Sequence, residues 1–400
     1  MSHAPLEREV LARQDGAPLA RLAWVGAAVG TVGLVASLLL AGAHTQRFYA
    51  SWLVAYLYGL SIALGSLFFT LVVFLCRASW GVAVRRVAEN VMATLPLFAV
   101  LFVPIWIGRH ELFSWTDAAE VAQNPILLGK RPYLNDTFFL IRALLYFVAW
   151  SGLAVYFSRQ SQQQDASGDE RITRRLQRVA APGLLIFALT LTFAAVDWIM
   201  SIEPEWYSTM IGVYYFTGST LAAFAFLIIV ITVIQARGPL RGVVTVEHMH
   251  DLGKLLFGFT VFWAYIAFSQ YFLIWYANIP EETAYYMHRA HGSWGTIGTA
   301  LIFGHFVVPF FFLMSRAIKR SAPLLVGAAL WLLAMHFMDL YWCVMPIFSP
   351  HGAELYALDA TTMIAVGGFV LGAFGWTSSR RALVPLGDPR LAESLSFENV

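Results

Sequence analysis

The amino-acid sequence predicts an all-α integral membrane protein with ten transmembrane helices, on three observations. First, 59% of the 400 residues are hydrophobic and 12% are charged, whereas about 25% of a soluble domain is charged. Second, ten apolar stretches approach the roughly 20 residues that cross ~30 Å of hydrocarbon. Third, Lys and Arg gather in alternate connections along the chain. These observations exclude a soluble globular domain, and the net charge of +2 gives no indication of nucleic-acid binding.

The transmembrane domain is expected over residues 22–377, between tails at 1–21 and 378–400. Its ten predicted spans are, in order, 22–42, 52–76, 90–108, 137–157, 179–202, 211–235, 252–277, 292–315, 322–345 and 358–377. The longest predicted connections are the loops 109–136 and 158–178. No extramembrane domain is expected, so any large soluble chemistry is assigned to partner proteins.

The distribution of positive charge predicts that both termini lie in the cytoplasm. The two tails and the connections after spans 2, 4, 6 and 8, counted with the adjoining span ends, hold 20 of the 26 Lys and Arg residues. The connections on the opposite side hold five. Because Lys and Arg accumulate on the cytoplasmic side of membrane proteins, the tails 1–21 and 378–400 are predicted to be cytoplasmic.

Spans 5 and 9 resemble each other and indicate an internal repeat. Each has an apolar run, an aspartate, an aromatic residue soon after it, and then a proline, Pro204 or Pro346, at the outer end. The two spans lie four apart in order and cross the membrane in the same direction. This pattern predicts two parallel four-helix bundles, spans 2–5 (52–202) and spans 6–9 (211–345), with spans 1 and 10 flanking them.

Spans 1 and 10 each carry two glycines separated by three residues, Gly26 with Gly30 and Gly368 with Gly372. Such spacing permits two membrane helices to approach closely. The alternative is that glycine is simply frequent in membrane helices.

Two aspartates lie inside otherwise apolar spans, Asp197 in span 5 and Asp339 in span 9. Counting about 1.5 Å of rise per residue places both in the outer quarter of the membrane. His336 lies three residues before Asp339 and shares its face of the helix, and Arg142 enters span 4 from outside to a comparable depth. Because charged groups in lipid are costly and usually functional, these residues predict an outer titratable cluster. The alternative is a set of structural ion pairs, or a position wetted from outside.

Further polar residues suggest a proton route toward that cluster. His305 of span 8 and Tyr265 of span 7 are expected near the middle of the membrane, and Gln270 is expected further out. The candidates at the inner face are Glu89, His248, His250, Asp251 and Lys254. The alternative readings are a packed histidine at 305 and ordinary interfacial residues at the inner face. Because the distances between these residues exceed the length of a hydrogen bond, such a route would need water molecules between them.

The sequence predicts that this chain holds no redox cofactor of its own. Only His305 and His336 could supply a pair of haem ligands, and no second pair is present for a two-haem arrangement. Phosphate-binding, dinucleotide-binding and iron–sulfur cysteine motifs are absent from the sequence.

Three stretches carry a resemblance to a known family: SWLVAYLYGLSIALGSLFF at 51–69, DWIMSIEPEWYSTMIGVYYFTGS at 197–219 and HFMDLYWCVMP at 336–346. With them the chain resembles the NrfD/polysulfide-reductase-like membrane subunits over roughly residues 20–380. Within that family it is most similar to the ActF-like subunits of bacterial alternative complex III, a quinol:electron-acceptor oxidoreductase.

The resemblance implies a respiratory-chain complex in the bacterial cytoplasmic (inner) membrane that passes electrons to an acceptor such as cytochrome c. It implies an iron–sulfur subunit, haem-c subunits and a homologous NrfD-like membrane subunit that usually carries the quinol site. This chain would be the proton-conducting half, with Asp197, His336 and Asp339 at the family's polar positions. Alternatives are a chain that itself binds quinone or quinol through His336 and Asp339, a stand-alone transporter, and a structural anchor.

Overall fold

The computed structural model describes residues 16–42 and 44–399, which form an all-helical protein. Within these residues, ten helical segments are long and apolar enough to cross a membrane, which is the number predicted from the sequence. These segments are α2 (Ala20–Ala41), α3 (Thr45–Leu75), α4–α6 (Val82–Met92, Leu95–Leu101 and Val103–Ile107), α10 (Asp136–Ser167), α11 (Glu170–Trp198), α12 (Ile211–Ala236), α13 (Val246–Ala277), α15 to α16 (Gly292–Leu301, then η4 at Ile302–Val307, then Val308–Met314), α18 (Ala322–Val344) and α19 (Ala357–Ser378). The shorter helices are η1 (Ala17–Leu19), α7 (Arg109–Leu112), η2 (Ser114–Thr116), α8 (Ala118–Gln123), α9 (Pro125–Lys130), η3 (Met200–Ile202), α14 (Pro280–Ala290), α17 (Arg316–Arg320), η5 (Met345–Ile347) and α20 (Leu391–Leu395). The chain is therefore a multi-pass membrane protein.

Helices α10 and α11 continue well beyond their apolar parts, so the predicted loop at 158–178 is almost entirely helical. Gly168 ends α10 in the left-handed conformation, with φ +66°, which glycine adopts without steric cost. The Asp169 side chain then accepts a hydrogen bond from the Arg171 backbone and begins α11. Hydropathy identifies only the apolar part of a helix, which is why the polar helical hairpin was expected to be a loop.

The third span is a helix in three pieces, with interruptions at residues 93–94 and at Phe102. Pro96 and Pro104 lie just after these interruptions. A proline lacks the backbone N–H and its ring collides with the carbonyl four residues earlier, which explains both breaks. The segment still crosses as one span.

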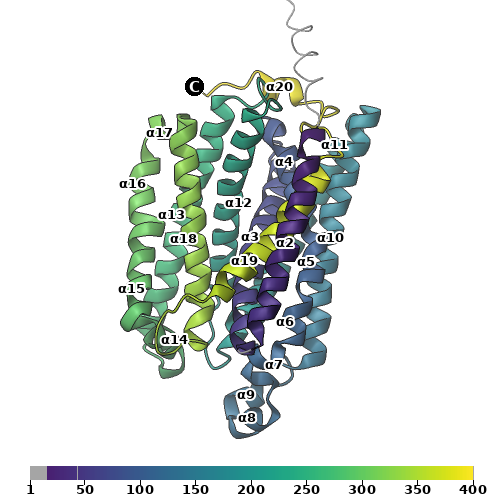
Figure 1. Ribbon diagram of the computed structural model, residues 1–400. Coiled ribbons are helices and arrows are strands. Elements are labelled where there is room, and N and C mark those ends of the chain that lie inside the picture. Colours follow the sequence, from purple (N-terminus) through teal and green to yellow (C-terminus); the bar gives the residue numbers. More distant parts are fainter. Residues whose placement is uncertain (1–15, 43, 400) are drawn as a thin grey trace, which may run out of the picture.

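Helices α2 and α19 pack with their backbones in contact, and Figure 1 shows them crossing side by side. A Cβ placed on Gly26 would lie 2.4 Å from the Gly372 nitrogen, and one on Gly368 would lie 2.4 Å from the Gly30 nitrogen. Neither distance leaves room for a side chain. The four glycines therefore mark the contact between the two helices, and the close approach that their spacing permits occurs here.

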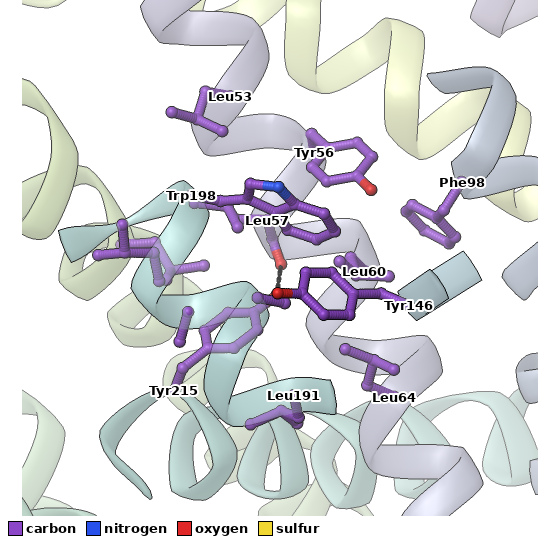
Figure 2. Close-up of a cluster of buried hydrophobic side chains, with 14 of the residues drawn as sticks. Leu53, Tyr56, Leu57, Leu60, Leu64, Phe98, Tyr146, Leu191, Trp198 and Tyr215 are labelled. Atoms are coloured by element: carbon purple, nitrogen blue, oxygen red, sulfur yellow. Dashed lines mark hydrogen bonds between the residues drawn. The ribbon is translucent and has the colours of Figure 1, made fainter. Parts of the chain in front are cut away.

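Helices α3 and α12 are the most buried of the ten spans and form the centre of the protein. Tyr56 of α3 contacts Phe98 of α5 and Trp198 of α11 edge to face, with ring centroids 5.7 Å apart in each pair. The Tyr215 hydroxyl of α12 donates a hydrogen bond of 2.8 Å to the Leu57 carbonyl, which joins the two central helices (Figure 2). Aromatic packing thus connects the helices on both sides of α3.

The described start of the chain and its C-terminal segment lie at one end of the protein. Gly16 packs so closely on α19 that a Cβ there would lie 1.8 Å from the Ser378 carbonyl oxygen. Helix α20 lies at this end, whereas α7 to α9 and α14 lie at the other (Figure 1). Because the chain crosses the membrane an even number of times, its start and its C-terminal segment lie on the same side. We refer below to the α20 end and the α14 end.

Candidate functional site

Asp197 of α11 forms a bidentate ion pair with Arg142 of α10. The Arg142 Nε and Nη2 groups donate to the two carboxylate oxygens at 2.8 and 2.9 Å, and the Tyr146 hydroxyl donates at 2.7 Å. Asp197 is fully buried, and the guanidinium also lies over the Tyr133 ring at 3.8 Å. The prediction that Arg142 reaches the depth of Asp197 is confirmed. The geometry is that of an ion pair joining two helices, with the carboxylate neutralised by its partner.

Asp339 of α18 is held by two uncharged donors instead. The Tyr214 hydroxyl of α12 donates to one carboxylate oxygen, and the Trp263 indole of α13 donates to the other at 3.1 Å. The side chain is buried, and it forms no ion pair with any residue in 16–42 or 44–399. Because no cation neutralises it, the Asp339 carboxyl group can take up or release a proton without breaking an ion pair.

The structure divides the predicted outer cluster into two separate sites. Asp197 lies between α10 and α11, and Asp339 lies between α12, α13 and α18; no hydrogen bond or ion pair links the two within the described residues. Within the described residues His336 forms no hydrogen bond with Asp339, and its Nε2 lies 3.0 Å from the Ser61 hydroxyl of α3. A spacing of three residues leaves two side chains about 60° apart around a helix. The His336 ring also packs on Gly218 of α12, where a Cβ would lie 2.7 Å from it, and Asp339 is bound by Tyr214 of the same helix. The two side chains therefore share the face of α18 that their spacing predicted, but they bind different partners.

His305 lies in η4, a π-helical turn within the eighth span. The residue is fully buried, its ring centroid lies 3.8 Å from that of Trp263, and neither ring nitrogen has a hydrogen-bond partner within 16–42 or 44–399. Pro309 cannot donate the α-helical hydrogen bond to the His305 carbonyl, which accounts for the widened turn. Single π-helical turns recur at functional sites. His305 thus lies against the same tryptophan that binds Asp339.

Tyr265 lies two residues after Trp263, which contacts His305, so the expected similar depth holds, but Tyr265 is not part of the buried group. Its side chain is 63% exposed on the outer surface of α13. Two residues along a helix rotate the side chain by about 200°, so Trp263 faces the interior and Tyr265 faces away. Gln270 is buried nearer the α14 end and contacts the Ser208 hydroxyl at 3.0 Å.

Glu89 at the α20 end belongs to a buried network of charges. Its carboxylate accepts from the Arg85 Nε at 2.8 Å and lies 2.9 Å from the Arg86 Nε. Arg85 also pairs with Asp388 of the C-terminal segment at 2.8 Å. Two arginines neutralise Glu89, so the geometry favours the alternative of a structural residue over a proton acceptor.

The other inner candidates form a separate group at the start of α13. Asp251 pairs with Lys254, and the His248 Nε2 lies 3.4 Å from the Ser394 hydroxyl of α20. His250 is buried, and its Nδ1 has no partner among the residues that the structure describes. Within the described residues, no hydrogen bond or ion pair joins any member of this group to Glu89. Of the inner candidates, His250 alone is a buried titratable side chain with an unused ring nitrogen.

A cavity of about 670 Å³ lies between α13, α14, α15 and η4. Tyr214 and Trp263, the two groups that bind Asp339, form part of its lining, together with Gln270. The cavity wall therefore includes one predicted residue, Gln270, and the two groups that bind another, Asp339. Sequence reasoning did not identify Tyr214 or Trp263, although both are aromatic residues with a polar atom inside apolar spans.

Two buried arginines at the α14 end were also missed. Arg47 of α3 pairs with Asp359 of α19 at 2.5 Å, and Arg289 of α14 pairs with Glu203 at 2.5 Å. Each is the only Lys or Arg in its connection as predicted from the sequence. An isolated arginine on the face that is poor in positive charge is the signal that could have identified them.

Neither protein-family models nor curated proteins give a match to this chain.

Proposed function

We propose that this chain is an integral membrane subunit of a quinol:electron-acceptor (cytochrome c) oxidoreductase in a bacterial respiratory chain, and that it conducts protons across the cytoplasmic membrane. The similarity of residues 51–69, 197–219 and 336–346 to NrfD-like subunits supports the first part. In this proposal, haem c and iron–sulfur clusters lie in partner subunits, a homologous NrfD-like subunit lies beside this chain, and this chain carries no redox cofactor.

The proposal includes a particular arrangement in the membrane. Residues 52–202 and 211–345 would form two four-helix bundles flanked by α2 and α19, with both termini in the cytoplasm. The packing of α10 on α11 and of α12 on α13 and α18 is consistent with such units. The excess of Lys and Arg at the α20 end supports a cytoplasmic location for that end.

The observation that carries proton conduction is the setting of Asp339. A carboxyl group buried in a membrane protein is costly and is usually retained for function. Asp339 is bound by Tyr214 and Trp263, with no cation beside it among the described residues, whereas Asp197 is neutralised by Arg142. Asp339 is therefore the proposed proton carrier, and Asp197 is assigned to structure.

The proposed route runs from the α20 end through the interior to Asp339. His250 begins it, and His305 with His336 provides titratable groups further along. No hydrogen bonds between described residues join His250, His305, His336 and Asp339 to one another. Water molecules would therefore complete the route, since a water-bridged contact is nearly as favourable as a direct one.

Replacing Asp339 in the intact complex tests the proposal. The complex would be purified from its native membrane in mild detergent, its subunits identified by mass spectrometry and its visible spectrum recorded. Asp339→Asn should retain the partner subunits and the haem spectrum, but lower the number of protons moved per electron in vesicles. Asp136→Asn is the matched control, because Asp136 is a partly exposed carboxylate at the α14 end.

Two results would overturn the proposal. An unchanged proton-to-electron ratio in Asp339→Asn would remove the conducting role, with membership of the complex intact. A colourless protein that purifies without haem-c and iron–sulfur subunits would remove membership itself and favour a stand-alone transporter.

A further inference from the structure

Helix α11 begins with a polar segment that carries four arginines on its exposed face. Residues three, four and seven apart lie on one side of a helix. We refer to these four exposed side chains as the arginine face: Arg171, Arg174, Arg175 and Arg178. On the opposite side, Ile172 and Leu176 are buried, and the Thr173 hydroxyl accepts a hydrogen bond of 2.6 Å from the Gln164 amide of α10. These contacts hold the arginine face away from the rest of the protein.

The arginine face has no acidic partner among the residues that the structure describes. None of its four guanidinium groups forms a hydrogen bond or an ion pair there. Of the nearby acidic residues, Asp165 binds α4, Asp169 caps the backbone of α11, and Glu170 forms no ion pair within 16–42 or 44–399. Like charges four residues apart repel each other, and cations near a helix N-terminus oppose the helix dipole. The arginine face therefore destabilises its own helix unless anions from outside the chain bind it.

The arginine face continues into the surface of α11 that faces lipid. Seven residues correspond to about two turns of helix, so Leu185 lies on the same side of α11 as Arg178. Leu185 is 69% exposed and Leu189 is 61% exposed, in the apolar part of a membrane-spanning helix. Figure 1 shows α10 and α11 at one edge of the protein. The four arginines therefore point toward the surrounding bilayer.

The depth of the arginine face matches the layer of lipid headgroups. The apolar part of this span begins at residue 179. At about 1.5 Å of rise per residue, Arg178 lies about 1.5 Å beyond that boundary, Arg175 about 6 Å and Arg171 about 12 Å. The headgroup layer extends roughly 5–8 Å beyond the hydrocarbon on each side. Arg174, Arg175 and Arg178 thus lie at the level of lipid phosphates, where a soluble anion or protein would have to displace headgroups.

We infer that the arginine face binds anionic phospholipids of the surrounding bilayer. A guanidinium group donates two parallel hydrogen bonds to a phosphate, and a cluster of about four or more Lys or Arg beside a membrane helix attracts anionic lipids. In this arrangement the phosphates neutralise the arginines, and the acyl chains lie along Leu185 and Leu189. A zwitterionic lipid fits less well, because its ammonium group would lie among the arginines. The inference is independent of the proposed function and of which side of the membrane holds the α20 end.

A photoreactive lipid tests the site. The full chain, with the subunits that it retains, is placed in phosphatidylcholine nanodiscs that contain a trace of either photoreactive phosphatidylglycerol or photoreactive phosphatidylcholine. Mass spectrometry of the digested chain should locate phosphatidylglycerol adducts in α11 near Leu185, at about tenfold the yield of the phosphatidylcholine probe. Inorganic phosphate should reduce these adducts no more than sodium chloride of equal ionic strength.

A pair of variants tests the arginines themselves. Arg174→Gln combined with Arg175→Gln should lower the preference for phosphatidylglycerol by about fivefold or more, since one arginine beside an anionic surface contributes about that factor. Arg237→Gln combined with Arg316→Gln is the matched control, because both arginines are exposed and lie at the α20 end outside α11. The control removes the same charge and should leave the preference unchanged.

Four results would overturn the inference: equal yields from the two probes, adducts that inorganic phosphate suppresses beyond the effect of salt, an equal loss in the control variant, or adducts that appear only after partner subunits are removed. The second result would assign the arginine face to free phosphate, and the last would assign it to an acidic surface of a partner protein. Each would leave the proposed function standing.

Discussion

At the scale of single residues, the partner of a buried carboxylate decides what it can do. Asp197 and Asp339 occupy similar places in their helices, four spans apart. Arg142 donates two hydrogen bonds of 2.8 and 2.9 Å to Asp197. Tyr214 and Trp263 donate hydrogen bonds to Asp339. A change of protonation at Asp197 would leave a buried guanidinium unpaired, and the same change at Asp339 would not. The two aspartates therefore have different expected roles.

Asp197→Asn should destabilise the protein by about 3–5 kcal/mol, the usual cost of removing one partner of a buried ion pair. The physical reason is that Arg142 keeps its charge inside the protein without a counterion. The free energy of unfolding in detergent measures the effect. Combining the change with Arg142→Gln should recover part of the loss, and a double variant no more stable than Asp197→Asn would contradict this account.

At the scale of the helices, backbone contact between α2 and α19 depends on glycine. Gly368 and its neighbour Gly367 offer a natural comparison. A Cβ on Gly368 would lie 2.4 Å from the Gly30 nitrogen, whereas one on Gly367 would meet nothing within 4 Å. Of these two adjacent glycines, Gly368 thus faces the backbone of α2, whereas Gly367 faces open space.

Gly368→Leu should lower the unfolding temperature and separate α2 from α19, because the leucine cannot fit against backbone atoms. Overpacking of this kind costs about 1–3 kcal/mol. Gly367→Leu should leave the unfolding temperature near that of the parent protein. Thermal unfolding in one detergent measures both, and equal shifts in the two variants would show that the contact between the helices is not responsible.

At the scale of the whole molecule, the described start of the chain at Gly16 lies beside the C-terminal segment, which covers the α20 end. Asp388 binds Arg85, and the Ser394 hydroxyl accepts from the Ala83 backbone and faces His248. These contacts join α4 to α13 across the ends of the helices between them. The proposed proton route would therefore begin beneath a packed segment of the protein.

Cysteine labelling in cells tests the orientation. With Cys76→Ser as background, Glu120→Cys in α8 should react with a membrane-impermeant maleimide added outside. Glu398→Cys, at the α20 end, should react only after the cells are opened, because the excess of Lys and Arg predicts that this end is cytoplasmic. Both positions are exposed, so failure to react reflects location. The reverse pattern would invert the topology and the direction of the proposed route.

The sequence alone determined the class of protein and the number of spans, because length and hydropathy identify a span. The glycine pairs indicated only that α2 and α19 could each approach another helix closely, and the tertiary structure decided that they pack against each other. The sequence also identified Arg142 as reaching the depth of Asp197, because a charge in lipid requires a partner. Only the tertiary structure decided which helix each polar side chain faces. It separated Asp197 from Asp339, turned His336 toward Ser61 and Tyr265 toward the outside, and brought Tyr214 and Trp263 from two other helices to Asp339. Rotation about a helix axis is set by packing against neighbours far away in sequence, and hydropathy contains no information about which neighbours those are.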